Sequence, residues 1–293
     1  MNFKALSPNF LKAIYRYFSQ RSWIAKIESL NIENSGTSDD LSFVKVDGLC
    51  YFGYSSDEVS KLVYRFFLKK ELKRIIHIDA FGLVLDVLYR NTEFKSDIET
   101  LENNKFVKLQ KGDVVLEGGA YIGLYAMQIS KKVGNTGKVI AVEAIEENFN
   151  VLKKNLAVNN ITNIIPVNCA IWEKEETLTF YRRNKQIASF SNEIVQESNQ
   201  EFQVSAKQVD TILIELGIKH IDYVRLQLNG AEINGLRGME ETLKQRPGLM
   251  IAAPYKLKGQ SLKIQIADYL KLKGFETSYH GVSVYFENDK IRV

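Results

Sequence analysis

The stretch "DVVLEGGAYIGLYA", residues 113–126, decides the fold. Its apolar run ends in Glu117, the glycines that follow permit a tight turn, and Gly123 opens a helical pattern. We therefore predict a strand, a turn and a helix, the arrangement by which many α/β proteins hold a nucleotide at a helix start. The kind of nucleotide has to be decided from the surrounding sequence.

The composition is that of a globular protein and disfavours several functional classes. Of the 293 residues, 45% are hydrophobic and 25% are charged, and the net charge of +4 is too small to indicate a nucleic-acid partner. The sequence has no apolar run long enough to cross a membrane and no signal-peptide core, so we expect no transmembrane segment and a cytoplasmic location. The two cysteines and three histidines are scattered, and we expect no metal site.

The chain divides into two parts. Residues 1–95 have the pattern of a mixed helix and hairpin region, with a polar loop at 33–40 and a hairpin that turns at Asp47 and Gly48. From residue 96 to residue 293 strands alternate with helices, which predicts a mostly parallel sheet covered on both faces. Within this part, residues 184–200 are polar and are expected to form a loop, whereas residues 230–245 are expected to form one helix.

The glycine loop fits two kinds of ligand. Gly118, Ala120 and Gly123 approximate the dinucleotide pattern, but Ala120 stands where a glycine normally lets the backbone approach a pyrophosphate. The other register is Glu117, Gly119 and Gly123. An acid at the end of the strand is unfavourable beside a pyrophosphate and favourable beside a ligand that carries an ammonium group and a sulfonium. This register favours S-adenosylmethionine as the cofactor.

Two further strand ends carry residues suited to an adenosine. Glu143 ends the strand "KVIAVEA", where a carboxylate accepts hydrogen bonds from ribose hydroxyls, and Ala144 follows it. Asn168 and Ala170 lie at the end of the next strand, where an adenine ring would rest. The ordered series at three successive strand ends is therefore more specific than any one of its members.

The carboxyl-terminal part distinguishes between the two ligands. It closes with a parallel strand, a helix and a hairpin with His280 and Gly281 at its turn, so the last two strands are expected to be antiparallel. This is the ending of the Rossmann-like, seven-stranded class I methyltransferase sheet. An NAD-dependent oxidoreductase would need a second mononucleotide half or a substrate domain with a catalytic His or Lys, and it is the least favoured alternative.

From about Lys111 to the carboxyl terminus, the sequence resembles the FkbM family of methyltransferases. The similarity is carried by "DVVLEGGAYIGLYA", "GKVIAVEAIEENFNVLKKNLAVNN", "VNCAIWEKEETLTFY", "VDTILIELGIKHIDYVRLQLNGAEINGLRGMEETL" and "GFETSYHGVSVYFE". The resemblance implies transfer of a methyl group from S-adenosylmethionine to a hydroxyl of a small molecule or a sugar. It leaves the acceptor and a possible homo-oligomeric state open, and the small net charge still gives no reason to expect a nucleic-acid partner.

The resemblance also assigns residues. Glu117, Gly119 and Gly123 match the family's cofactor loop, and Glu143 matches its ribose carboxylate, whereas Tyr121 and Ala144 depart from the family pattern. The candidate cofactor-binding residues are Glu117, Gly118, Gly119, Tyr121, Gly123, Glu143, Ala144, Asn168 and Ala170. The stretch "QLNGAE" matches a motif that usually reads Asp, apolar, Glu, Gly, any residue, Glu, so Gln227 and Asn229 replace two carboxylates while Glu232 is retained. Gln227, Asn229, Glu232 and Tyr255 are the candidate catalytic residues, with His280 as another candidate base.

These departures raise a second hypothesis. Amides can orient a hydroxyl by hydrogen bonds, but they are not useful bases near neutral pH. Tyr121 stands where the family usually has a small residue or Asn, and it either stacks on the cofactor or fills the cofactor's place. If it fills that place, the protein is a catalytically degenerate binding or scaffold protein that keeps the methyltransferase fold.

Overall fold

The computed structural model describes residues 32–38, 41–46, 49–53, 109–184, 187–195, 200–281 and 283–286. The helices expected within residues 1–31 and 54–95 lie outside these ranges. Strands β1 (Ile32–Ser38), β2 (Leu41–Val46) and β3 (Leu49–Gly53) form a small antiparallel sheet. The expected hairpin is confirmed, because Val46 of β2 pairs with Leu49 of β3. The loop expected at 33–40 is wrong, because pairing with β2 makes most of it a strand despite its weak strand propensity.

The main sheet has seven strands. They are β4 (Val114–Gly118), β5 (Lys138–Glu143), β6 (Ile164–Asn168), β11 (Tyr223–Leu226), β12 (Gly248–Ala252), β15 (Ser278–His280) and β16 (Ser283–Phe286). Their order is β15-β16-β12-β11-β4-β5-β6, and only the pairs that involve β16 are antiparallel. This order and the terminal hairpin confirm the class I methyltransferase sheet.

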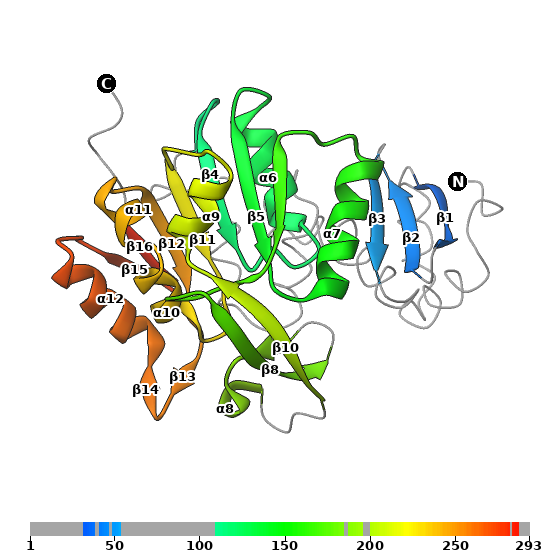
Figure 1. Ribbon diagram of the computed structural model, residues 1–293. Coiled ribbons are helices and arrows are strands. Elements are labelled where there is room, and N and C mark those ends of the chain that lie inside the picture. Colours follow the sequence, from blue (N-terminus) through cyan, green and yellow to red (C-terminus); the bar gives the residue numbers. More distant parts are fainter. Residues whose placement is uncertain are drawn as a thin grey trace, which may run out of the picture.

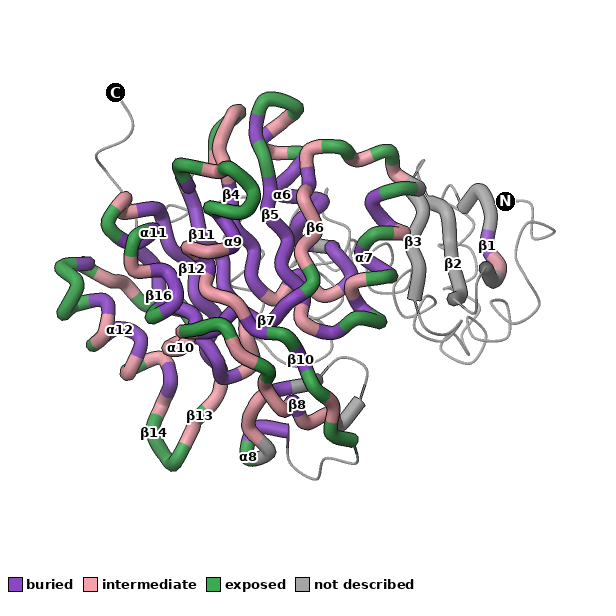
Figure 2. The backbone as a smooth tube through the Cα atoms, viewed as in Figure 1, coloured by how far each residue is buried: buried purple, intermediate pink, exposed green. Residues whose placement is uncertain are grey.

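Helices cover both faces of this sheet (Figure 1). Helices α6 (Leu124–Val133) and α7 (Glu146–Val158) connect β4, β5 and β6 and pack on one face. The other face carries α9 (Val209–Glu215), α10 (Glu232–Arg237), α11 (Glu240–Lys244) and α12 (Leu262–Leu272). The apolar residues of the central strands are accordingly buried, and the tube in Figure 2 is coloured mostly as buried along β4, β5, β11 and β12.

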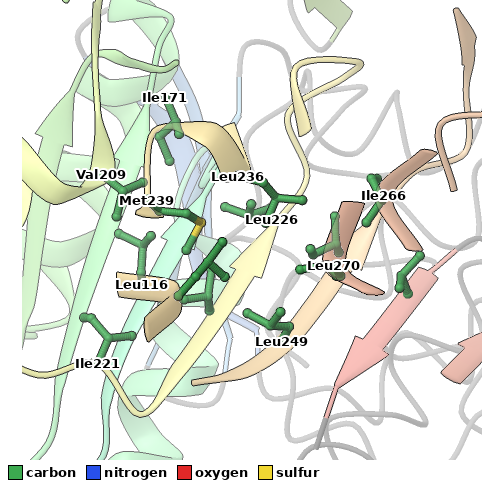
Figure 3. Close-up of a cluster of buried hydrophobic side chains, with 14 of the residues drawn as sticks. Leu116, Ile171, Val209, Ile221, Leu226, Leu236, Met239, Leu249, Ile266 and Leu270 are labelled. Carbon is green, nitrogen blue, oxygen red and sulfur yellow. The ribbon is translucent and has the colours of Figure 1, made fainter. Parts of the chain in front are cut away.

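The core on the second face joins the sheet to α9–α12. Figure 3 shows Leu116, Leu226 and Leu249 of the sheet gathered with Leu236, Met239 and Leu270. The single helix expected over 230–245 is wrong, since it breaks at Gly238 into α10 and α11. A Cβ at Gly238 would overlap the carbonyl oxygen of Trp172, so the chain approaches its neighbour too closely there for any other residue.

Additional elements extend from the carboxyl ends of the parallel strands (Figure 1). After β6, a second sheet forms from β7 (Ala170–Ile171), β8 (Glu176–Asn184), β9 (Ile187–Ser189) and β10 (Gln200–Lys207), with helix α8 (Asn192–Val195) beside it. The loop expected at 184–200 is therefore partly wrong, because it includes β9 and α8. After β12, β13 (Lys256–Leu257) and β14 (Gln260–Ser261) form a short hairpin.

The core of α12 gives a direct test of this packing. Leu270 is fully buried, whereas Leu272, on the same helix, is 86% exposed. We expect Leu270→Ala to lower the free energy of unfolding by about 2–5 kcal/mol, because it removes buried methyl groups and leaves a cavity. Leu272→Ala should change it by less than about 0.5 kcal/mol. Urea unfolding of the two variants measures both values, and equal losses would contradict the packing of α12.

Candidate functional site

The glycine loop after β4 is shaped by a close approach to β11. Gly119 has a φ of +80°, and a Cβ there would overlap the carbonyl oxygen of Gln227. Gly123 has a φ of +88°, and a Cβ there would overlap the side chain of Leu152 on α7. Gly119 therefore needs glycine for conformation and for space, because its neighbour is backbone, and Gly123 needs it for its conformation. Gly118 contributes only backbone, since the place of its missing side chain is filled by core residues.

Tyr121 lies in the middle of this loop in a left-handed conformation, with a φ of +53°. This conformation is unfavourable for a bulky residue and is tolerated by Asn or Gly. The Tyr121 N–H donates to Oε2 of Glu143 over 2.8 Å, so the second strand end holds the loop of the first. Tyr121 is partly exposed, and its side chain lies at the surface of the loop rather than in the core.

Glu143, at the end of β5, is buried and accepts several hydrogen bonds. Besides Tyr121, the Ile145 N–H donates to its Oε1 over 3.0 Å and the Asn148 side chain donates over 3.1 Å. Burial raises the pKa of Glu143, while these hydrogen bonds oppose the rise. A carboxylate has about four acceptor positions, so this one keeps capacity for a further donor. Ala144 follows it at the rim.

Asn168, at the end of β6, has a fixed orientation. Its Nδ2 donates to the carbonyl oxygens of Glu143 over 2.8 Å and of Ala144 over 3.4 Å. The side-chain oxygen therefore faces away from β5, and the residue is exposed. Ala170 is buried in β7, so only its backbone lies near this edge.

A polar cleft of about 500 Å³ opens beside Asn168. Ala144 and the start of α7 form one wall, and residues 200–205 of β10 form the other. Arg182 of β8 spans the cleft, donating to both oxygens of Glu147 over 3.0 and 2.9 Å. Its guanidinium also lies 4.7 Å from the ring centre of Phe202. The second sheet and α7 are thus tied together next to Asn168.

Glu117 and Arg225 form a buried ion pair beneath the loop. Oε1 of Glu117 lies 3.1 Å from Nη1 of Arg225, and both side chains are 1% exposed. The guanidinium also stacks on Tyr125, 3.4 Å from the ring centre. Burial raises the pKa of Glu117 to about 7, Arg225 opposes the rise, and Glu143 adds to it. Among the described residues, Oε2 of Glu117 has no hydrogen-bond partner.

Arg225 was missed by the sequence reasoning. The signal was present, because Arg225 is the one charged residue within the otherwise apolar strand "YVRL" of β11. A cation in a strand that is buried throughout must have an anionic partner. Its register opposite Glu117 in the parallel β4–β11 pair identifies that partner, but only once the strand order is known.

Two of the candidate catalytic residues meet at the carboxyl ends of β11 and β12. The Tyr255 hydroxyl donates to Oδ1 of Asn229 over 3.3 Å. Asn229 has a φ of +50°, and its carbonyl oxygen accepts from the Ser189 hydroxyl over 2.7 Å. Ser189, which no sequence pattern singled out, joins the second sheet to this edge. The side chain of His280 lies outside the described residues.

Glu232 turns inward and holds the loop that follows β11. Its two carboxylate oxygens accept from the N–H groups of Leu228, over 2.9 Å, and of Gly230, over 3.0 Å. It is fully buried, and burial raises its pKa to about 7 while the backbone hydrogen bonds oppose the rise. These contacts give Glu232 a structural role in shaping the loop, whereas its predicted role as a base remains a prediction.

The described part of the chain contains no cluster of His, Cys, Asp and Glu side chains able to hold a metal ion. Within the same residues, no helix is long and apolar enough to cross a membrane.

The buried acids predict an unusual dependence of stability on pH. Glu117 and Glu232 have pKa values of about 7, against an ordinary value of 4.5. The folded state therefore holds these protons more tightly than the unfolded state, and this contribution to stability is lost as the pH rises from about 4.5 to about 7. We expect the free energy of unfolding of Glu117→Gln to fall less over this pH range than that of the unaltered protein, because the glutamine has no proton to lose. Urea unfolding between pH 5 and pH 8 measures it.

The matched control for this measurement is Glu241→Gln, which changes an exposed glutamate. Its pH dependence should follow that of the unaltered protein. If Glu117→Gln also leaves the slope unchanged, Glu117 does not hold a proton in the folded state at pH 5.

Two curated methyltransferases are similar to this chain in sequence. Methyltransferase sdnD of Sordaria araneosa is 23% identical over 215 residues, which cover 63% of this chain and 79% of that protein. A tRNA (adenine(58)-N(1))-methyltransferase catalytic subunit of Yarrowia lipolytica is 35% identical over 60 residues. The latter match covers 20% of this chain and only 15% of the tRNA methyltransferase.

Solved structures show the same kind of similarity. An FkbM methyltransferase from Methylobacillus flagellatus KT is 13% identical, with a TM-score of 0.48, and the match covers 80% of this chain and 63% of that one. Fibrillarin from Aeropyrum pernix, in complex with natively bound S-adenosyl-L-methionine, is 12% identical, with a TM-score of 0.45 and coverages of 87% and 97%. The methyltransferase FkbM domain profile matches residues 117–277, more than half of the chain, and the chain therefore belongs to the FkbM methyltransferase domain family.

Proposed function

We propose that the protein is an S-adenosylmethionine-dependent methyltransferase that methylates an oxygen of a small-molecule or glycan acceptor. The observation that carries this proposal is the placement of Glu117, Glu143 and Asn168 at the carboxyl ends of three adjacent strands, β4, β5 and β6. Family membership supports the reaction type, and the geometry supports the cofactor.

The strand order indicates in which direction a bound ligand runs across the sheet edge. Chain progression reverses between β4 and β11, and ligands of open α/β sheets bind outside the carboxyl ends at such a switch point. With the adenine at Asn168 and the ribose at Glu143, an extended ligand continues over β4 toward β11. Its aminoacyl and sulfonium groups then lie at the glycine loop, beside Gln227.

The individual contacts suit an adenosyl ligand. The outward oxygen of Asn168 is an acceptor for the amino group of adenine, because its nitrogen is already engaged. Glu143 retains acceptor capacity for a ribose hydroxyl. At the far end, the unpartnered Oε2 of Glu117 supplies negative charge beneath the loop, which favours a cationic ligand there and would lower the raised pKa of Glu117.

The remaining residues act by positioning. Bound S-adenosylmethionine would supply an electrophilic methyl group, and the chain would hold the acceptor in line with it. Asn229, Tyr255 and Ser189 form a connected polar edge on the acceptor side of β11 and β12. Glu232 keeps the connecting loop in shape by accepting from two of its N–H groups.

Calorimetric titration with S-adenosylhomocysteine tests the cofactor site. We expect binding by the unaltered protein and a loss of about tenfold or more in affinity for Glu143→Ala, because a charge-assisted hydrogen bond to the ribose is removed. Glu241→Ala, which changes an exposed glutamate of α11 away from the cleft beside Asn168, is the matched control and should bind normally. No binding by the unaltered protein at millimolar ligand would refute the cofactor assignment.

Asn168 gives a second test that does not depend on the ribose. S-inosylhomocysteine carries a carbonyl oxygen where S-adenosylhomocysteine carries the amino group, so it presents an acceptor to the acceptor oxygen of Asn168. We expect the unaltered protein to prefer the adenosyl ligand by about tenfold or more. In Asn168→Ala the preference should fall toward unity. Equal affinities in the unaltered protein would place the adenine elsewhere.

The second candidate is a non-catalytic binding protein, which the conformation of Tyr121 favours. A bulky residue kept in a left-handed turn of the cofactor loop has a conformational cost of about 1–2 kcal/mol. If its ring occupies the ligand's place, the unaltered protein will not bind S-adenosylhomocysteine and Tyr121→Ala will. Binding by the unaltered protein excludes the version of this alternative in which the Tyr121 ring fills the ligand's place.

A further inference from the structure

The side-chain amide of Gln227 has a fixed polarity. Oε1 of Gln227 accepts a hydrogen bond from Nη2 of Arg225 over 2.8 Å. A guanidinium has donors only, so the amide oxygen, and not the amide nitrogen, must face Arg225. Arg225 is itself held by Glu117 and stacked on Tyr125, so the buried guanidinium fixes the orientation of the Gln227 amide.

The amide nitrogen of Gln227 therefore faces the opposite way. The residue lies just beyond β11 at the switch point and is half-buried, whereas Arg225 beneath it is 1% exposed. Nothing in the described part of the chain accepts a hydrogen bond from this NH₂ group. The motif that "QLNGAE" resembles has a carboxylate at this position, which accepts, whereas Gln227 presents a pair of donors.

The other polar groups on this edge do not reverse that polarity. Oδ1 of Asn229 accepts from the Tyr255 hydroxyl, and Glu232 is fully buried with both oxygens accepting from backbone N–H groups. Glu117 is buried beneath the loop. A ligand group above Gln227 thus meets N–H donors, which suit an anionic oxygen, while the charge of the guanidinium behind them is balanced by Glu117.

We propose that Gln227 is a specificity-determining residue that donates from its side-chain nitrogen to a carboxylate bound over the β4–β11 switch point. The proposal rests on the proposed function. Two carboxylates can supply this chemistry, the one on the aminoacyl part of the cofactor and one on the methyl acceptor. The experiment has one arm for each.

A carboxylate acceptor is consistent with Gln227 and Asn229 standing where the resembled motif has acids. A hydroxyl must lose its proton during transfer and benefits from a base, whereas a carboxylate is already ionised near neutral pH. Its oxygen would form an O–CH₃ bond as the S–CH₃ bond of the sulfonium breaks. The electron pair of that bond stays on sulfur, the two charges cancel, and the products are a methyl ester and S-adenosylhomocysteine. No proton is transferred.

The first arm measures binding by calorimetry, without catalysis. The probes are S-adenosylhomocysteine and its decarboxylated analogue, in which hydrogen replaces the carboxylate. If Gln227 donates to the cofactor, Gln227→Glu weakens S-adenosylhomocysteine by about tenfold or more and leaves the analogue nearly unchanged, because only the carboxylate is repelled. Gln245→Glu makes the same charge change beside Ile221, at the opposite end of β11, and should alter neither affinity.

The second arm measures transfer. The protein is incubated with S-adenosylmethionine labelled on the methyl group and a small-molecule extract of the producing organism, and the products are treated with mild base. Methyl esters release volatile methanol under these conditions, whereas methyl ethers do not. If Gln227 donates to the acceptor, the label is base-labile, and Gln227→Glu lowers its incorporation by about tenfold or more while both calorimetric affinities stay unchanged.

The two failures can be told apart. Absence of S-adenosylhomocysteine binding by the unaltered protein refutes the proposed function, and this inference falls with it. The inference alone is overturned by two results together. The unaltered protein and Gln227→Glu both bind S-adenosylhomocysteine with the same preference over the decarboxylated analogue, and no base-labile label depends on Gln227. An increase in base-stable label in Gln227→Glu would also overturn it, because a hydroxyl acceptor gains from a carboxylate at this position.

Discussion

The close approach of the glycine loop to the end of β11 is the constraint on which the site depends. Gly119 can have no side chain because the Gln227 carbonyl occupies its place, and the Gln227 N–H donates to the Gly118 carbonyl over 3.0 Å. This contact brings the strand ends on either side of the switch point together. It also directs the loop back over β5, where the Tyr121 N–H reaches Glu143.

The polar groups at these strand ends are organised in two layers. The lower layer consists of Glu117, Arg225 and Tyr125, which are buried and hold one another. The upper layer consists of Asn168 and Gln227. The amide nitrogen of Asn168 is held by the carbonyl oxygen of Glu143, and the amide oxygen of Gln227 is held by Arg225. Because an amide has one accepting and one donating end, fixing one end determines what the other offers. Asn168 thus presents an acceptor, and Gln227 presents donors.

Much of the fold could be predicted from the sequence, because strand and helix periodicities and turn residues are local signals. The strand ends that carry Glu117, Glu143 and Asn168 were predicted on the same basis. The pairing of Arg225 with Glu117 and the contact between Tyr255 and Asn229 could not be, since they join strands far apart in the chain. The inward turn of Glu232 was also out of reach, because it depends on the path of a loop whose N–H groups need an acceptor. The break at Gly238 depends likewise on a distant carbonyl.

The central claim is that an adenosyl ligand lies across the carboxyl ends of β6, β5 and β4, with its aminoacyl end toward β11. A crystal structure of the complex with S-adenosylhomocysteine tests it most directly. The account predicts a ribose hydroxyl within hydrogen-bond distance of the Glu143 carboxylate, the adenine amino group at the Asn168 oxygen, and the aminoacyl carboxylate or the space for an acceptor at the Gln227 nitrogen. A ligand bound in the reverse direction, or bound away from the glycine loop, would contradict it.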